Sequence, residues 1–173
     1  MNDQPNRQAT DVNPLTEQQV DLLKEENWID YRCPNTAAPP VLGFLQLCAD
    51  RRFHRCIQER FQKDAGLQSP EEYWIHADAG GTPKMECQRT APDYCYYDKQ
   101  VRLMGWSAHG DGCGGFGPNV PDSVIRQALI VVWRRKTEEY PEARHFVYFA
   151  TLIKEGDAEE TVVNCLKYEK QAD

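Results

Sequence analysis

VLGFLQLCADRRFHRCIQERF, residues 41–61, is the stretch that decides the fold class of this 173-residue chain. Its first seven residues are apolar with little alternation, which predicts a strand covered on both faces. Phe53, Ile57 and Phe61 then recur every four residues and predict an amphipathic helix that begins directly after that strand. A strand followed at once by a helix is half of a βα unit and indicates an α/β fold.

The rest of the chain continues this alternation. Further strands are predicted at residues 73–81, after a short helical turn at Ser69 and Pro70, and at residues 101–108, 145–153 and 161–169, the last at a sheet edge. Residues 82–98 show no clear period and are predicted to be an irregular connection. These patterns predict a single α/β domain with a mostly parallel sheet of four or five strands flanked by helices.

A second long helix is predicted to begin at Pro121, because proline is common at the first position of a helix. Its apolar residues form two adjacent rows, Val124, Ala128, Val132 and Ile125, Leu129, Trp133. Ile130 and Val131 widen this apolar surface. We therefore expect the helix to be buried on most sides.

The chain is predicted to have a flexible N-terminal arm, residues 1–14, and one domain, residues 15–173. The arm has almost no apolar side chains and contains two prolines. Thr16 and Gln19 have the spacing of a capping box and predict a helix over residues 16–27. No linker or internal repeat divides the domain.

Composition excludes several classes of partner. Asp and Glu total 27 against 20 for Lys and Arg, a formal net charge of -7, so the phosphate backbone of nucleic acid is a poor partner. No apolar run approaches the roughly 20 residues that a membrane span needs, and Met1 opens a polar stretch unlike a signal peptide. We expect a cytoplasmic protein.

Seven cysteines are many for a chain of this length, and an odd number cannot all pair with one another. No two of them form a Cys-x-x-Cys pair, which disfavours a zinc ribbon or a thioredoxin-type redox centre. Any metal site must therefore gather ligands from distant segments. The cysteines are Cys33, Cys48, Cys56, Cys87, Cys95, Cys113 and Cys165.

Metal-binding side chains follow two of the predicted strands. The first strand ends in CADRR, residues 48–52, and the third ends in HGDGC, residues 109–113. Ligands of open α/β sheets bind at the carboxyl ends of strands, so Cys48, His109 and Cys113 converge if the two strands are neighbours. Two thiolates and an imidazole are the ligands of a catalytic zinc site whose fourth position is open.

These residues resemble motifs of the β-class carbonic anhydrases. Cys48, Asp50 and Arg52 match the Cys-x-Asp-x-Arg motif of that family position by position. His109 and Cys113 are similar to its His-x-x-Cys-Gly motif, with three residues between them instead of two. The resemblance covers roughly residues 40–155, but ADAG at residues 77–80 replaces the Arg-Asn-Ala-Gly of the family.

The resemblance implies a zinc lyase that catalyses the reversible hydration of carbon dioxide to bicarbonate by a zinc-bound hydroxide. It implies that Cys48, His109 and Cys113 hold the zinc ion. Asp50 would orient the reacting group, and Arg52 would keep that carboxylate ionised. In some members the aspartate instead occupies the fourth zinc position. The family also implies a homodimer or a larger homo-oligomer.

Other interpretations stay open. Asp50 is also placed to cap a helix, and Cys48 is also placed to be a small buried apolar residue. The chain is alternatively a non-catalytic relative, or one that acts on carbonyl sulfide or carbon disulfide. A nucleotide-binding domain is a third possibility, because Gly110, Gly112 and Gly115 satisfy Gly-x-Gly-x-x-Gly after a strand.

The remaining metal-capable residues show no spacing typical of a site. Asp111 is a minor candidate ligand, because aspartate beside glycine is also common in turns. Cys87 and Cys95 are minor candidates for a second metal site or an oxidised link. His54 and His76 are expected to have packing or surface roles, whereas His145 precedes a strand and has no evident partner. Cys56 and Cys165 have no spacing that indicates a site.

Overall fold

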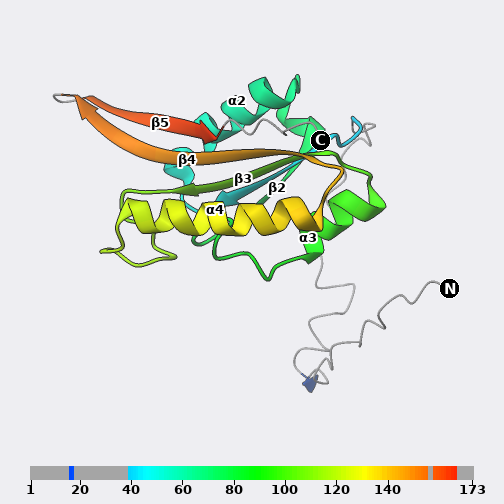
Figure 1. Ribbon diagram of the computed structural model, residues 1–173, viewed down its shortest axis with the longest axis horizontal. Helices are drawn as coiled ribbons and strands as arrows, with labels where there is room; N and C mark the ends of the chain where they lie inside the picture. Colours follow the sequence, from blue (N-terminus) through cyan, green and yellow to red (C-terminus); the bar gives the residue numbers. More distant parts are fainter. Residues whose placement is uncertain (1–15, 18–38, 156–157, 167–173) are drawn as a thin grey trace. The chain divides into compact units, whose positions relative to one another are not determined.

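The computed structural model describes residues 16–17, 39–155 and 158–166. The unit Ala38–Asp173 is built around a five-stranded sheet with the strand order β2-β1-β3-β4-β5 (Figure 1). The predicted arm at residues 1–14 and nearly all of the predicted helix at residues 16–27 lie outside the described residues.

The described part confirms the α/β fold. β1 pairs in parallel with β2 and β3, and β3 pairs in parallel with β4. β5 lies at a sheet edge, as predicted for the fifth strand, and pairs antiparallel with β4. In chain order the elements are β1 (Gly43–Cys48), the 3₁₀ turn η2 (Arg51–Phe53), α2 (His54–Ala65), the 3₁₀ turn η3 (Pro70–Glu72), β2 (Tyr73–Asp78), α3 (Thr90–Asp93), the π-helical turn η4 (Tyr94–Asp98), β3 (Leu103–His109), α4 (Asp122–Glu139), β4 (Arg144–Glu155) and β5 (Ala158–Leu166).

Helices cover both faces of the sheet, with α2 on one side and α4 on the other (Figure 1). All six residues of β1 are buried, in agreement with its continuous apolar run. Successive side chains of a strand point to opposite faces. Leu45 and Leu47 therefore join the core beneath α2, whereas Phe44 and Cys48 join the core beneath α4.

The core beneath α2 is organised around Phe61, which is fully buried. Its ring makes edge-to-face contacts with Tyr73, Phe146 and Tyr148, at centroid distances of 5.2, 5.6 and 6.4 Å. Gly105 of β3 leaves room for this ring, since a Cβ atom there would lie 3.1 Å from Phe61 and 2.6 Å from a methyl group of Leu45. Close packing of an aromatic ring thus explains the glycine in the middle of a strand.

α4 follows Pro121, as predicted, but it is not buried on most sides. Ile125, Leu129 and Trp133 face the sheet and are buried, whereas Val124 and Val131 are 48% and 44% exposed. The sheet covers one face of the helix, and no other described element covers the opposite one. Among the described residues, no helix combines the length and apolar character needed to cross a membrane.

Residues 82–98 are partly helical, which the sequence pattern did not predict. α3 and η4 span four and five residues, too few to show a helical period. Tertiary contacts stabilise them instead: Cys95 and Tyr96 are buried in the core beneath α4, and the Tyr140 hydroxyl donates a hydrogen bond to Asp93 at 2.7 Å. Short helices depend on such packing, because their own propensity is too weak.

His145 has a buried partner that sequence reasoning missed. The indole nitrogen of Trp106 donates a hydrogen bond to its Nδ1 at 2.9 Å, and its Nε2 donates to the carbonyl of Tyr140 at 3.0 Å. Nδ1 must therefore be unprotonated, and the imidazole is neutral. Burial lowers the pKa of His145 below its ordinary value of about 6.5, against the smaller opposing effect of the Tyr140 carbonyl.

We predict that this histidine makes the protein less stable in mild acid. Because the pKa of His145 is lower in the folded protein than in the unfolded chain, the unfolded chain binds more protons below about pH 6.5. The stability of the fold therefore decreases as the pH is lowered through that range. The wild type should lose more thermal stability between pH 7.5 and 5.5 than His145→Gln, which retains an acceptor for Trp106. Thermal melting of both proteins at the two pH values tests this prediction. An equal decrease in melting temperature for the wild type and His145→Gln would contradict it.

Candidate metal centre

Three side chains of types that can bind a metal lie together where β1 and β3 end. Cys48 is the last residue of β1, His109 is the last residue of β3, and Cys113 lies in the loop after β3. β1 and β3 are parallel neighbours, so their carboxyl ends lie at the same edge of the sheet. The strand pairing on which the predicted convergence depended is therefore present.

The three side chains are buried together. Their ligand atoms all lie within 4.8 Å of one another, and the sulfurs of Cys48 and Cys113 are 3.8 Å apart. The Nδ1 atom of His109 donates a hydrogen bond to the carbonyl oxygen of Gly110 at 2.6 Å. In the neutral ring Nε2 therefore carries the lone pair, and this buried atom has no hydrogen-bond partner among the described residues.

An unpartnered buried nitrogen beside two thiols fits a bound metal ion. A buried polar atom without a partner costs free energy, which coordination to a metal would recover. Two sulfurs and one imidazole nitrogen match the protein ligands of a catalytic zinc site with one open position. The hydrogen bond at Nδ1 also fixes the tautomer that such a ligand needs.

The two thiols of the cluster differ in how readily they ionise. Burial opposes ionisation of Cys48, but a protonated His109 and the backbone amides of Asp50 and Gly80 favour the thiolate more strongly and lower its pKa to about 7. Burial raises the pKa of Cys113, and the adjoining Cys48 thiolate raises it further. Cys113 therefore stays a neutral thiol beside an ionised Cys48, and a positive ion bound between the two sulfurs would favour the thiolate form of both.

Asp50 and Arg52 form an ion pair at the rim of the cluster. Arg52 donates from Nε to both carboxylate oxygens at 3.1 Å and from Nη2 to Oδ2 at 2.6 Å. These hydrogen bonds from Arg52 are the main reason that the pKa of Asp50 lies below its ordinary value. Oδ2 is 3.9 Å from Nε2 of His109, so the ionised carboxylate faces the candidate ligands.

Asp50 also caps the turn that begins after it. Its Oδ1 accepts a hydrogen bond from the backbone amide of Arg52 at 3.1 Å. The capping role and the position beside the metal ligands are therefore compatible, because the carboxylate has a second oxygen. Arg52 also reaches the carbonyl of Asp111 at 3.4 Å and so connects the two loops that carry the cluster.

The loop after β3 turns through two residues with positive backbone φ angles. Asp111 has φ of 54° and Gly112 has φ of 79°. Gly110 does not have a positive φ. It instead leaves room for the Asp122 carboxylate, which would clash with a Cβ atom at position 110.

That arrangement argues against nucleotide binding by the glycine loop. The Asp122 carboxylate accepts a hydrogen bond from the amide of Asp111 at 3.1 Å, so a negative charge lies where a phosphate would bind. Gly115 packs against the turn after β2, since a Cβ atom there would clash with the backbone of Gly80. The glycines thus serve packing between loops.

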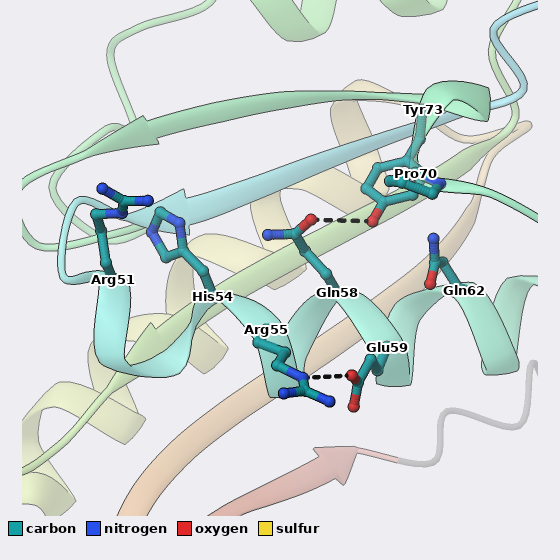
Figure 2. Close-up of a pocket in the computed structure, with 8 residues that line it drawn as sticks. All are labelled: Arg51, His54, Arg55, Gln58, Glu59, Gln62, Pro70 and Tyr73. Carbon is teal, nitrogen blue, oxygen red and sulfur yellow. Dashed lines mark hydrogen bonds and ion pairs between the residues drawn. The ribbon is translucent and has the colours of Figure 1, made fainter.

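His54 has a structural link to the cluster that its sequence position did not reveal. Its Nε2 donates to the carbonyl oxygen of Cys48 at 2.6 Å, across the turn η2. The side chain also lines an open groove of about 390 Å³ along α2 (Figure 2). Arg55 and Glu59 form an ion pair on that helix, with 2.8 Å between Nε and Oε1. The groove is lined by Arg51, His54, Arg55, Gln58, Glu59, Gln62, Pro70 and Tyr73.

Among the described residues, the other candidates are not part of the cluster. The Asp111 carboxylate accepts a hydrogen bond from the amide of Leu152 at 2.5 Å, as expected of a turn residue. Cys87 is exposed and Cys95 is fully buried, and both are free thiols, so the structure contains no link between them. His76 lies 3.4 Å from the amide nitrogen of Gln46. Cys33 is outside the described residues.

Comparisons of the sequence with family models and with curated proteins give no match. Among solved structures, the chain is similar to one of two tetrameric β-carbonic anhydrases from Sordaria macrospora, with 12% identity and a TM-score of 0.38 over 65% of this chain and 76% of that one. It is also similar to a β-carbonic anhydrase mutant of Aspergillus fumigatus, with 11% identity and a TM-score of 0.36 over 69% and 88%.

Proposed function

We propose that this chain binds one zinc ion through Cys48, His109 and Cys113 and catalyses the reversible hydration of carbon dioxide. The observation that carries the proposal is the buried, unpartnered Nε2 of His109, within 4.8 Å of two cysteine sulfurs. The nearby Asp50 carboxylate, held by Arg52, supports a catalytic rather than a purely structural site. A structural zinc site usually has a fourth protein ligand instead.

When bound, the zinc ion would supply an acidified water molecule as the nucleophile near neutral pH. Asp50 would accept a hydrogen bond from the nucleophile and direct its lone pair at carbon dioxide, because Arg52 keeps the carboxylate ionised and oriented. The Gly110 carbonyl holds His109 in the required tautomer. Water and carbon dioxide give bicarbonate and one proton, which leaves to solvent.

Metal analysis and stopped-flow hydration of carbon dioxide on the purified wild type test this proposal. We expect about one zinc per chain and hydration well above the uncatalysed rate, with activity lost on chelation and restored by added zinc. Zinc without hydration would overturn the catalytic part and favour the non-catalytic or altered-substrate alternative, which carbonyl sulfide and carbon disulfide would then test. Absence of zinc would overturn the metal centre.

A further inference from the structure

Phe53 contacts two separate parts of the metal centre. Its ring stacks on the imidazole of His109, with centroids 4.4 Å apart and planes inclined by 21°. The guanidinium carbon of Arg52 lies 5.2 Å from the centroid of the same ring. We propose that Phe53 is a positioning residue that holds His109 and Arg52 in the geometry that the metal centre needs. This inference rests on the proposed zinc site.

His109 needs such support because it has one hydrogen bond. The contact from Nδ1 to the Gly110 carbonyl fixes one point of the ring but leaves rotation about that contact. A flat aromatic surface against the imidazole restricts this rotation and keeps Nε2 directed at the two sulfurs. The stacking is well defined, because Phe53 is only 1% exposed and packs among the core residues beneath α2.

Arg52 also needs support, since its side chain is about half exposed. An exposed ion pair restrains two flexible side chains weakly. Contact with the Phe53 ring limits the guanidinium to positions from which it donates to both oxygens of Asp50. Phe53 therefore acts on Asp50 indirectly, through Arg52, and on the proposed zinc ligand directly.

Phe61 offers a matched control for substitutions of Phe53. Both phenylalanines are buried in the same core cluster, and about two helical turns separate them. The ring of Phe61 contacts Tyr73, Phe146 and Tyr148 rather than residues of the metal centre. Leucine at either position removes a buried ring and destabilises the fold. Only the change at Phe53 removes the contacts with His109 and Arg52.

The test compares zinc affinity in the wild type, Phe53→Leu, Phe53→Met and Phe61→Leu. Competition with a chromophoric chelator measures the affinity, and the visible spectrum of the cobalt-loaded proteins reports ligand geometry. We expect both Phe53 variants to bind zinc about tenfold more weakly or worse, a usual loss when the support of a ligand is removed. Their cobalt bands should shift, whereas Phe61→Leu should match the wild type.

Two results would overturn the inference while leaving the zinc site intact. One is wild-type affinity and an unchanged cobalt spectrum in a folded Phe53 variant. The other is an equal loss of affinity in Phe61→Leu, because the loss would then follow stability alone. The side chain in Phe53→Met fills much of the space of the ring, so this variant provides the zinc affinity and cobalt spectrum if Phe53→Leu fails to fold. Failure of the wild type to bind zinc would instead overturn the proposed function itself.

Discussion

Cys48→Ser should reduce the zinc content from about one ion per chain to nearly none and abolish the hydration of carbon dioxide. A serine hydroxyl stays protonated near neutral pH, so it does not replace the anionic sulfur ligand. The remaining pair, His109 and Cys113, is too small a ligand set for a stable zinc site. Elemental analysis after extensive dialysis and stopped-flow hydration on the same samples measure both effects.

Cys87→Ser is the control for this substitution, because Cys87 is an exposed free thiol outside the cluster. It should retain the zinc and activity of the wild type. The melting temperatures of Cys48→Ser and of chelator-treated wild type should agree within a few degrees. Such agreement would show that the substitution removes the metal without unfolding the protein. Full zinc occupancy in folded Cys48→Ser would contradict the assignment of Cys48 as a ligand.

Asp50→Asn should lower the hydration rate about 100-fold or more while leaving zinc bound. The amide is uncharged, so the site loses the ionised acceptor that we propose orients the nucleophile, and one such preorganised group is usually worth roughly 10² to 10³ in rate. Asparagine caps a helical turn about as well as aspartate. The turn η2, which Asp50 caps, should therefore persist. Steady-state hydration and zinc content together test the expectation.

Asp111→Asn provides the comparison for Asp50→Asn. Asp111 lies on the neighbouring loop, and its carboxylate accepts from the amide of Leu152, a bond that an amide oxygen also makes. It should keep activity within a few-fold of the wild type. Unchanged hydration in Asp50→Asn would refute the catalytic role, and loss of zinc from that variant would instead indicate that the carboxylate is itself a ligand.

Local pattern was sufficient to predict the elements that carry the site. The apolar run before Cys48 and the four-residue spacing of Phe53, Ile57 and Phe61 predicted a buried strand and an amphipathic helix, and both are present. These patterns are informative because the spacing of the apolar side chains follows from the geometry of one helix or one strand by itself. The predicted ligands and the Asp50–Arg52 motif lie at the ends of such elements.

Other features depend on contacts between distant segments, and there the predictions failed. The short helix at Thr90–Asp93 is held by Tyr140, 47 residues from Asp93. The exposure of Val124 and Val131 depends on how many faces of α4 the fold covers, which apolar spacing alone does not specify. The role of Gly110 depends on the carboxylate of Asp122, which lies in the first turn of α4.

The sequence by itself determined the α/β class, the order of the strands along the chain and the residues able to bind a metal, because periodicity and side-chain chemistry are local properties. Only the tertiary structure decided that β1 and β3 are neighbours, which brings Cys48, His109 and Cys113 together. It also placed Phe53 against His109 and His54 against the Cys48 carbonyl. Such contacts join side chains from separate elements, and their geometry is set by how helix and sheet pack.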